Sequence, residues 1–272
     1  MTSAVVTIAH GRHEHLAAQR QSLLASDQRP DHHVVVAMDD PGIGSWRPTG
    51  DLVPHVVRVG MTPLGLPLAA ARNAGVAAAI GLGADVVMCL DVDCLAAPDL
   101  VAGYADVVRR SPGVVWSGPV TYLPAAGPTG YDLGQLDALD DPHQARPRPA
   151  RGEEQMGGDP NLFWSLSFAL HRDAWLRSGG FCEEYVGYGA EDTDFGSQAV
   201  AAGLDLAWTG SARAYHQHHP TQSPPVDHLD DILRNGRLFR RRWGRWPMTG
   251  WLEEFERLGL VVRSDDDWVA VD

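Results

Sequence analysis

The chain has 272 residues, of which 44% are hydrophobic and 21% are charged, and its formal net charge is −13. This is an ordinary globular composition, and the chain is long enough for one large core or two small ones. The negative charge argues against a nucleic-acid partner and against a general binder of anionic membranes. No run reaches the roughly 18 consecutive apolar residues of a membrane helix, so we expect no transmembrane segment.

The three cysteines, Cys89, Cys94 and Cys182, do not have the spacing of a metal finger or of a disulfide framework. The N-terminus has no basic region of the kind that begins a secretory signal. We therefore expect a cytoplasmic protein. Peripheral contact with the inner face of the membrane is the alternative location.

Short β-branched runs alternate with Ala- and Leu-rich runs through the first half of the chain. We predict strands at residues 4–9, 33–37, 55–59 and 85–90, and helices at residues 14–24, 66–82 and 99–108. This alternation predicts an α/β fold with a Rossmann-like, mostly parallel central sheet and helices on both faces. The continuous apolar run at 86–90 is typical of a central strand.

Residues 119–160 are rich in Pro, Gly and Asp and show little periodicity. They could form a linker, but we favour a long ordered lid or acceptor loop, because long irregular loops in compact domains are often functional. Beyond it we predict strands at 166–170 and 212–216, and helices at 191–202, 227–239 and 248–258. We therefore expect a single domain over residues 1–225, and a C-terminal helical extension over 226–272 packed on it.

Asp91-Val92-Asp93 directly follows the apolar strand. If the strand continues, its alternation sends both carboxylates to the same side, at the strand end where open α/β sheets bind ligands. Two acidic groups there could hold a divalent ion together with a diphosphate, since Mg²⁺ and Mn²⁺ accept oxygen ligands. A solvated strand end or a helix cap is the alternative.

Three carboxylates, Glu191, Asp192 and Asp194, follow the glycine-rich loop 187–190. Acidic residues favour the first turn of a helix, which explains one or two of them without any function. The functional interpretation is that one carboxylate acts as a general base toward an acceptor hydroxyl.

Three histidines, His216, His218 and His219, follow the predicted strand at 212–216. Imidazole is a common ligand of transition metals, and His216 and His218 would share one side if the strand continued. Histidines on the surface before Pro220 are the alternative. The presence of the Asp-Val-Asp motif elsewhere in the chain favours a metal site completed by one histidine.

Taken together, these segments resemble inverting glycosyltransferases of the GT-A fold, from about Ala4 to about His219. The resemblance is to family-2 enzymes and to the acceptor motif of β-1,4-galactosyltransferase-type enzymes (families 7 and 27). The segments that carry it are Gly11–Leu16, Ala71–Gly75, Leu90–Asp93, Gly179–Phe181 and Gly189–Phe195. Two departures, Ala190 in place of a glycine and Tyr188 in place of a frequent tryptophan, leave the sugar and the acceptor open.

The resemblance implies a metal-dependent transfer of a sugar from a nucleotide-diphosphate sugar, with UDP-sugar as the expected donor, to an acceptor hydroxyl with inversion. Asp192 would be the catalytic base and Glu191 would assist it and bind the acceptor. The other acceptor-binding residues would be Trp164 and Tyr188. The donor-binding residues would be Ala9, His10, Arg12, Asp39, Asp40, Arg72, Asn73, Asp91 and Val92. The ligands of Mn²⁺ or Mg²⁺ would be Asp93 and His216, with Asp91, His218 and His219 as weaker candidates.

Other functions share parts of this pattern. A retaining GT-A transferase, a metal-dependent phosphoesterase and a non-catalytic nucleotide-sugar-binding protein are the alternatives. A sugar nucleotidylyltransferase is disfavoured, because the first predicted strand is not followed by a glycine-rich basic loop. The sequence does not identify the acceptor, which we expect to be a glycan, a lipid-linked molecule or a small molecule. It also leaves open whether the chain forms a homo-oligomer.

Residues 234–246 hold six arginines interleaved with Phe239, Trp243 and Trp246, a local reversal of the negative charge. The simpler interpretation is an amphipathic helix whose arginines pair with acidic neighbours. The acidic neighbours available are Asp230, Asp231, Glu253 and Glu254. The alternative is a docking surface for an anionic partner, because arginine suits phosphate and tryptophan suits an interface.

Overall fold

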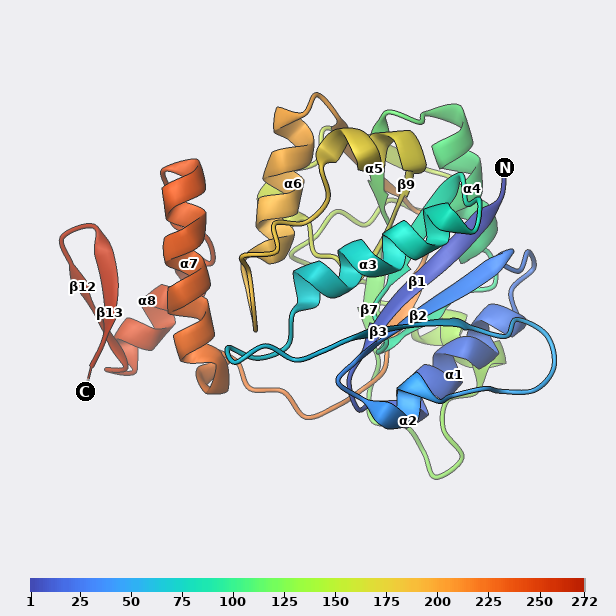
Figure 1. Cartoon of the computed structure of the whole chain (residues 1–272), viewed down its shortest axis with the longest axis horizontal. Helices are drawn as coiled ribbons and strands as arrows, with labels where there is room; N and C mark the ends of the chain where they lie inside the picture. Colours follow the sequence, from blue (N-terminus) through green and yellow to red (C-terminus); the bar gives the residue numbers. More distant parts are fainter. Residues whose placement is uncertain (272) are drawn as a thin grey trace.

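Eight strands form the central sheet of the computed structural model, which describes residues 1–271. Their order is β3-β2-β1-β4-β9-β6-β10-β8 (Figure 1). The strands are β1 (Ser3–Ala9), β2 (His32–Met38), β3 (His55–Val59), β4 (Val86–Leu90), β6 (Val114–Ser117), β8 (Glu154–Met156), β9 (Ser167–His171) and β10 (Asp205–Thr209). All run in one direction except β9, which is antiparallel to β4 and β6, and β8, which is antiparallel to β10. The predicted mostly parallel sheet is confirmed.

Strand β1 lies between β2 and β4, with Val6 opposite both Val34 and Cys89. Every residue of β1 and of β4 is buried, which requires helices on both faces of the sheet. Val87 and Met88 of β4 point to opposite faces, because side chains alternate along a strand. Val87 shares a core with the helices of one face, and Met88 with those of the other.

Helices α3 (Leu68–Gly81), α5 (Arg172–Ser178) and α6 (Glu191–Ala201) cover the face of Val87, and α1 (His13–Leu24) and α4 (Leu100–Arg110) cover the face of Met88 (Figure 1). A short helix, α2 (Pro41–Gly44), follows β2. Helices on both faces are therefore confirmed. The sequence analysis missed β6, β10 and α5.

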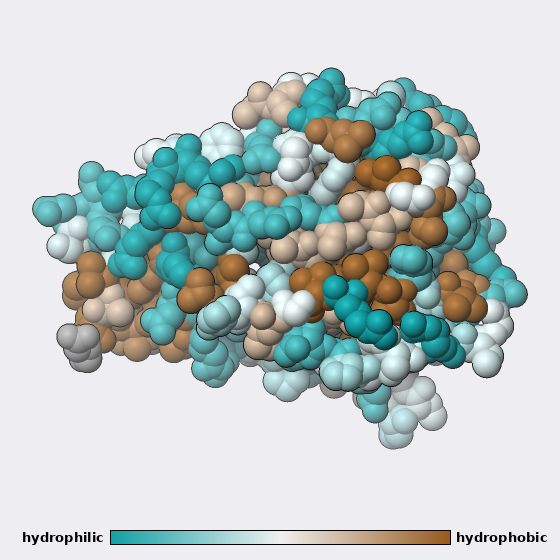
Figure 2. Space-filling model, viewed as in Figure 1, coloured by the Kyte–Doolittle hydropathy of each residue, from teal (hydrophilic) through white to brown (hydrophobic). Residues whose placement is uncertain are grey.

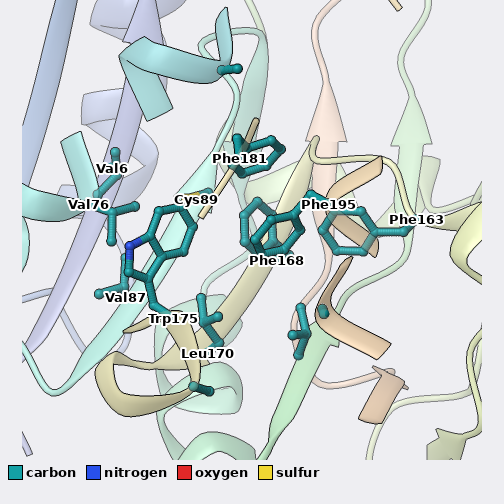
Figure 3. Packing of buried hydrophobic residues seen from close by; sticks show 14 of the residues in the cluster. Val6, Val76, Val87, Cys89, Phe163, Phe168, Leu170, Trp175, Phe181 and Phe195 are labelled. Atoms are coloured by element: carbon teal, nitrogen blue, oxygen red, sulfur yellow. The ribbon is translucent and has the colours of Figure 1, made fainter. Parts of the chain in front are cut away.

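An aromatic cluster joins β9 to α6 (Figure 3). Phe168 packs edge-on against Phe163, with ring centroids 5.1 Å apart, and Phe181 stacks on Phe195 at 4.3 Å. Trp175 of α5 lies beside Phe195 at 5.7 Å. Large buried rings contribute much of the apolar surface that stabilises a core. The cluster therefore fixes the start of α6 against the sheet.

A second, three-stranded sheet lies beside the carboxyl end of β4. Its order is β5-β11-β7, formed by β5 (Cys94–Ala96), β11 (Ala214–His216) and β7 (Val120–Tyr122). In its register His216 lies opposite both Cys94 and Tyr122. This pairing brings the end of the 212–216 segment next to the Asp-Val-Asp motif.

The segment 119–160 is more regular than predicted. It contains β7, a 3-10 helix (η1, Leu133–Leu139) and β8 at the edge of the main sheet. Leu123, Leu136 and Arg146 are buried within it. The segment is therefore built into the domain and is not a linker.

The C-terminal extension was expected to be helical, and this is wrong for its last part. Helices α7 (Leu229–Trp243) and α8 (Thr249–Arg257) follow a 3-10 turn, η3 (Val226–His228), but the chain then forms a hairpin of β12 (Val261–Ser264) and β13 (Asp267–Ala270). Trp268 of the hairpin packs with Ile232 and Phe255, so the strands cover the far side of the helices. Figure 2 shows hydrophobic residues at the lower left, over the hairpin and α8. Within residues 1–271, none of the helices has the length and apolarity needed to cross a bilayer.

Candidate active site

A cavity of about 180 Å³ opens at the carboxyl ends of β1, β2 and β4. It is lined by Ile8, His10, Arg12, Met38, Leu66, Leu68, Arg72, Asp91, Val92 and Asp93. This is the edge of an open α/β sheet at which ligands bind. Five of the residues predicted to bind donor, His10, Arg12, Arg72, Asp91 and Val92, therefore line one cavity together with Asp93.

The Asp-Val-Asp motif forms a turn rather than a continuation of the strand. Strand β4 ends at Leu90, and the backbone N of Cys94 donates to the carbonyl of Asp91 at 2.8 Å. The expectation that strand alternation aligns the carboxylates is therefore wrong. Asp91 and Asp93 still line the same cavity. Both lie in the short turn between the end of β4 and the start of β5.

Asp93, His216 and His219 form a cluster of metal-binding side chains. One ligand atom of each lies within 4.8 Å of the others, and Nε2 of His219 is 3.4 Å from Oδ2 of Asp93. Strand β11 ends at His216, so the strand geometry that would have aligned His218 does not continue, and His218 is exposed. The expectation that His216 and His218 share one side of a continuing strand is therefore wrong, and of the two weaker candidates His218 and His219 it is His219 that lies beside Asp93.

Two residues that follow β1 also contact Asp93. Nδ1 of His15 is 2.9 Å from Oδ1 of Asp93, and Nε of Arg12 is 3.8 Å from the same oxygen. Oδ1 is buried, and despite these two contacts it makes no hydrogen bond of acceptable geometry within the described residues. The sequence analysis gave His15 no role. Its place on the first helix after β1, one turn from Arg12, is the signal that could have suggested one.

His216 is held as a neutral imidazole. Its ring stacks on Tyr122 of β7, with centroids 4.6 Å apart, and burial lowers the pKa of His216 to about 4. A neutral imidazole has a free nitrogen lone pair, which is the form that binds metal.

Arg72 of α3 connects the donor cavity with the acidic cluster. Its guanidinium lies 3.2 Å from Asp91 and 3.4 Å from Glu191. Burial opposes the charge of Arg72, but Asp91, Asp192 and Glu191 outweigh it and raise the pKa of Arg72. Burial raises the pKa of Asp91 to about 6, and burial together with the charge of Asp192 raises the pKa of Glu191 to about 8. Burial therefore shifts Glu191 toward its protonated form, and the Arg72 guanidinium opposes that shift.

Asp192 lies in the first turn of α6 and is half-buried. Ser165, just before β9, donates from its backbone N to Oδ2 at 3.1 Å and from its hydroxyl to Oδ1 at 2.7 Å. Sequence analysis missed Ser165, which carries no recognisable motif. Its neighbour Trp164 is half-buried and packs against His143 at 5.2 Å.

The remaining predicted donor residues have other contacts. Asp40 caps α2 by accepting from the backbone N of Ile43 at 2.9 Å, and it also accepts from the backbone N of Gly11 at 2.8 Å. Asp39 is exposed, and Ala9 is buried at the end of β1.

Asn73, also predicted to bind the donor, is not among the residues that line the cavity. Its side chain binds the backbone N and O of Phe181, each at 2.9 Å. Asn73 therefore ties α3 to the loop before α6.

Tyr188 lies between the acidic cluster and the C-terminal extension. Its ring stacks on His228 at 4.5 Å and on Trp251 at 5.8 Å. Burial, followed by the charges of Glu191 and Asp192, raises the pKa of Tyr188 to about 12. Its hydroxyl therefore stays protonated beside the acidic pair.

The arginines of α7 pair mostly with acidic side chains of the same chain. The pairs are Arg234–Asp231 at 2.7 Å, Arg237–Asp267 at 3.1 Å, Arg240–Asp266 at 3.3 Å and Arg242–Asp194 at 2.7 Å. This supports the simpler interpretation of the segment, although only Asp231 of the four expected acidic neighbours is among these partners.

Comparison with known proteins agrees with this geometry. Residues 159–220, which contain Ser165, the acidic cluster and the histidines, match the family model described as the N-terminal domain of galactosyltransferase. No curated protein sequence is similar enough to the chain to count as a relative.

Solved structures show the same fold. The structure of GalNAc-T7 with UDP, GalNAc and Mn²⁺ aligns with a TM-score of 0.55 and 14% identity, over 94% of this chain and 57% of that one. The structure of residues 1–349 of S. aureus TarS in complex with UDP-GlcNAc aligns with a TM-score of 0.59 and 11% identity, over 93% of this chain and 76% of that one. The fold is therefore the GT-A fold of these glycosyltransferase structures, and residues 159–220 are similar to a domain of galactosyltransferases. The chain spans little more than half of the GalNAc-T7 structure.

Proposed function

We propose that the chain transfers a sugar from a nucleotide-diphosphate sugar, with a UDP-sugar as donor, to an acceptor hydroxyl, in a metal-dependent reaction that inverts the anomeric carbon. The observation that carries the proposal is the convergence of Asp93, His216 and His219 beside the cavity, where Arg72 contacts both Asp91 and Glu191, the residue next to Asp192. The bound UDP, Mn²⁺ and UDP-GlcNAc named for the two similar structures support the choice of donor and cofactor.

The residues fit a divalent metal. Oδ1 of Asp93 is buried without a hydrogen-bond partner among the described residues, and His216 is neutral. One carboxylate with two imidazoles suits Mn²⁺ better than Mg²⁺, which prefers oxygen ligands. When bound, the ion would neutralise the departing diphosphate as a Lewis acid.

The protein's own side chains would position the donor. Arg12 and His10 are exposed at the mouth of the cavity, where a cation and a hydrogen-bonding ring can contact a diphosphate. Arg72 would hold Asp91 toward the sugar, because its guanidinium contacts that carboxylate from a buried position.

Asp192 would take the proton of the acceptor hydroxyl as that oxygen attacks the anomeric carbon from the face opposite the diphosphate, which inverts configuration. Its two hydrogen bonds from Ser165 fix the carboxylate while leaving lone pairs free. Burial raises the pKa of Glu191 and so favours its protonated form, in which Glu191 would donate a hydrogen bond to the acceptor. This division of roles favours Asp192 as the base.

The test is a set of UDP-sugars incubated with the protein and Mn²⁺, first for thermal stabilisation and then for release of UDP. We expect at least one to stabilise the fold by mass action, UDP release to require the metal, and the product to have inverted configuration by NMR. Undiminished turnover after chelation would reject the metal. A retained configuration would reject the inverting scheme, and hydrolysis of simple phosphate esters without sugar transfer would reject the function.

A further inference from the structure

Helix α7 holds the loop that leads into the acidic pair. The two N–H groups of the buried Asn235 amide are shared among the carbonyls of Val186, Tyr188 and Gly189, at 3.0, 3.2 and 3.1 Å from Nδ2. Two residues after Gly189 the chain reaches Glu191. One side chain of the C-terminal extension therefore binds three of the carbonyls immediately before the proposed base.

The loop is shaped to let the extension approach closely. Gly187 and Gly189 have φ angles of 71° and 94°, the left-handed region that favours glycine. A Cβ at Gly187 would collide with the carboxylate of Asp231, and one at Gly189 would lie 2.9 Å from the sulfur of Met248. Asp231 also accepts from the backbone N of Tyr188 at 3.1 Å.

The last turn of α7 binds the segment that follows Glu191 and Asp192. Asp194, three residues after Glu191, is fully buried, and its Oδ1 accepts from Nε of Arg242 and from Nε1 of Trp243, each at 2.7 Å. The same helix therefore binds the backbone of the loop before Glu191 and Asp192 and the side chain of Asp194 after them. In addition, Trp251 of α8 stacks on Tyr188.

The same loop reaches the donor cavity. The backbone N of Gly187 donates to the carbonyl of Leu66 at 2.9 Å, and Leu66 lines the cavity. The loop 186–190 therefore contacts both the extension and the cavity wall. When these contacts hold it in one conformation, the position of α7 determines the position of Glu191 and Asp192.

We propose that the C-terminal extension is a working part of the acceptor site and that Asn235 is its positioning residue, which sets the place of Glu191 and Asp192 through the loop 186–190. The proposal rests on the proposed function. It also goes beyond the family match, which ends at residue 220, before the extension begins.

The test compares three variants with the wild type. Asn235→Leu removes the three donations while keeping a similar size, and Asp231→Asn is a milder change that weakens the bond to Tyr188. Arg241→Gln changes an exposed side chain of the same helix and is the matched control. The measurements are UDP affinity with Mn²⁺, metal-dependent turnover of UDP-glucose, UDP-galactose and UDP-N-acetylglucosamine with water as acceptor, amide hydrogen exchange of residues 186–192, and melting temperature.

In Asn235→Leu we expect exchange at 186–192 to rise and turnover to fall by about 10- to 100-fold, the usual effect of a misplaced reacting group. UDP affinity should stay within about twofold, because the nucleotide cavity is formed by other elements. Asp231→Asn should show the same pattern to a smaller extent, and Arg241→Gln should show none of it.

Unchanged exchange and turnover in both Asn235→Leu and Asp231→Asn would overturn the proposal. So would a parallel fall of melting temperature, UDP affinity and turnover in both variants, since that pattern describes a purely structural role. If the wild type turns over none of the three sugars, the proposed function fails for these donors. The exchange of residues 186–192 then still decides whether Asn235 holds the loop.

Discussion

Ser165 donates two hydrogen bonds to Asp192, one from its backbone N at 3.1 Å and one from its hydroxyl at 2.7 Å. The two oxygens of the carboxylate are therefore bound by one residue, which restricts rotation of the carboxylate without pairing it to a cation. Such an arrangement suits a base whose position matters more than its strength.

Replacing Asp192 with Asn keeps the shape and removes the proton acceptor. We expect turnover of the UDP-sugar to fall by about 10²- to 10⁴-fold, the usual contribution of a general base, with little change in UDP affinity. Ser165→Ala should lower turnover by about tenfold, because the backbone bond remains after the hydroxyl is lost. Thr193→Ala, at the neighbouring position, is the control. Loss of UDP binding in Asp192→Asn with normal turnover at saturation would place Asp192 in the donor site.

Replacing His219 with Ala should weaken Mn²⁺-dependent binding of UDP by at least about tenfold, and Asp93→Ala should do the same, because each removes a ligand of the proposed metal. His218→Ala, at an exposed position, should have no effect. The measurement is calorimetric titration of UDP with and without Mn²⁺. Equal effects of the His218 and His219 variants, or UDP binding that ignores Mn²⁺, would contradict the assignment.

The raised pKa of Glu191 predicts a pH dependence of stability. Its ordinary value is 4.5, and in the fold it is about 8, so between these values the folded protein holds a proton that the unfolded chain has lost. The stabilisation from this proton is fully present below about pH 4.5 and is lost as pH rises toward 8.

Glu191→Gln should remove this dependence. The free energy of unfolding of the variant minus that of the wild type should therefore increase from pH 5 to pH 8, with a slope of at most about 1.4 kcal/mol per pH unit. Urea unfolding at several pH values, in the absence of metal, measures it. Exposed Glu256→Gln is the control. A difference that is constant or that decreases with pH would show that Glu191 is ionised in the folded protein.

The arginines of α7 should differ in their effect on stability. Arg242→Leu removes a hydrogen bond to the fully buried Asp194 and should cost about 1–3 kcal/mol, the range for a charged hydrogen bond whose buried partner is left less satisfied. Arg241→Gln, on the exposed side, should stay within about 0.5 kcal/mol of the wild type. Equal effects in chemical unfolding would contradict the pairing described for α7.

Local patterns in the sequence determined much of the fold. The strand predicted at 85–90 and the helix predicted at 191–202 differ from β4 and α6 by one residue at one end, because continuous apolar runs and helical periodicity are properties of neighbouring residues. Strands β6 and β10 were missed, because they are only four and five residues long and their pairing is with segments distant in the chain. The C-terminal hairpin pairs locally, but it was missed as well because its strands of four residues each show no clear alternation.

The composition of the candidate site was also largely predictable, because acidic and imidazole side chains at strand ends indicate metal and phosphate chemistry whatever their final arrangement. Which of these side chains meet was decided only by tertiary structure. Strand β11 ends at His216, and the turn that follows leaves His218 exposed and brings His219 to Asp93. Ser165 and Asn235 reach the loop and helix of the acidic pair from 27 and 46 residues away in the chain. Contacts over such separations depend on how the sheet and helices pack, and that packing leaves no periodic trace in the sequence near either partner.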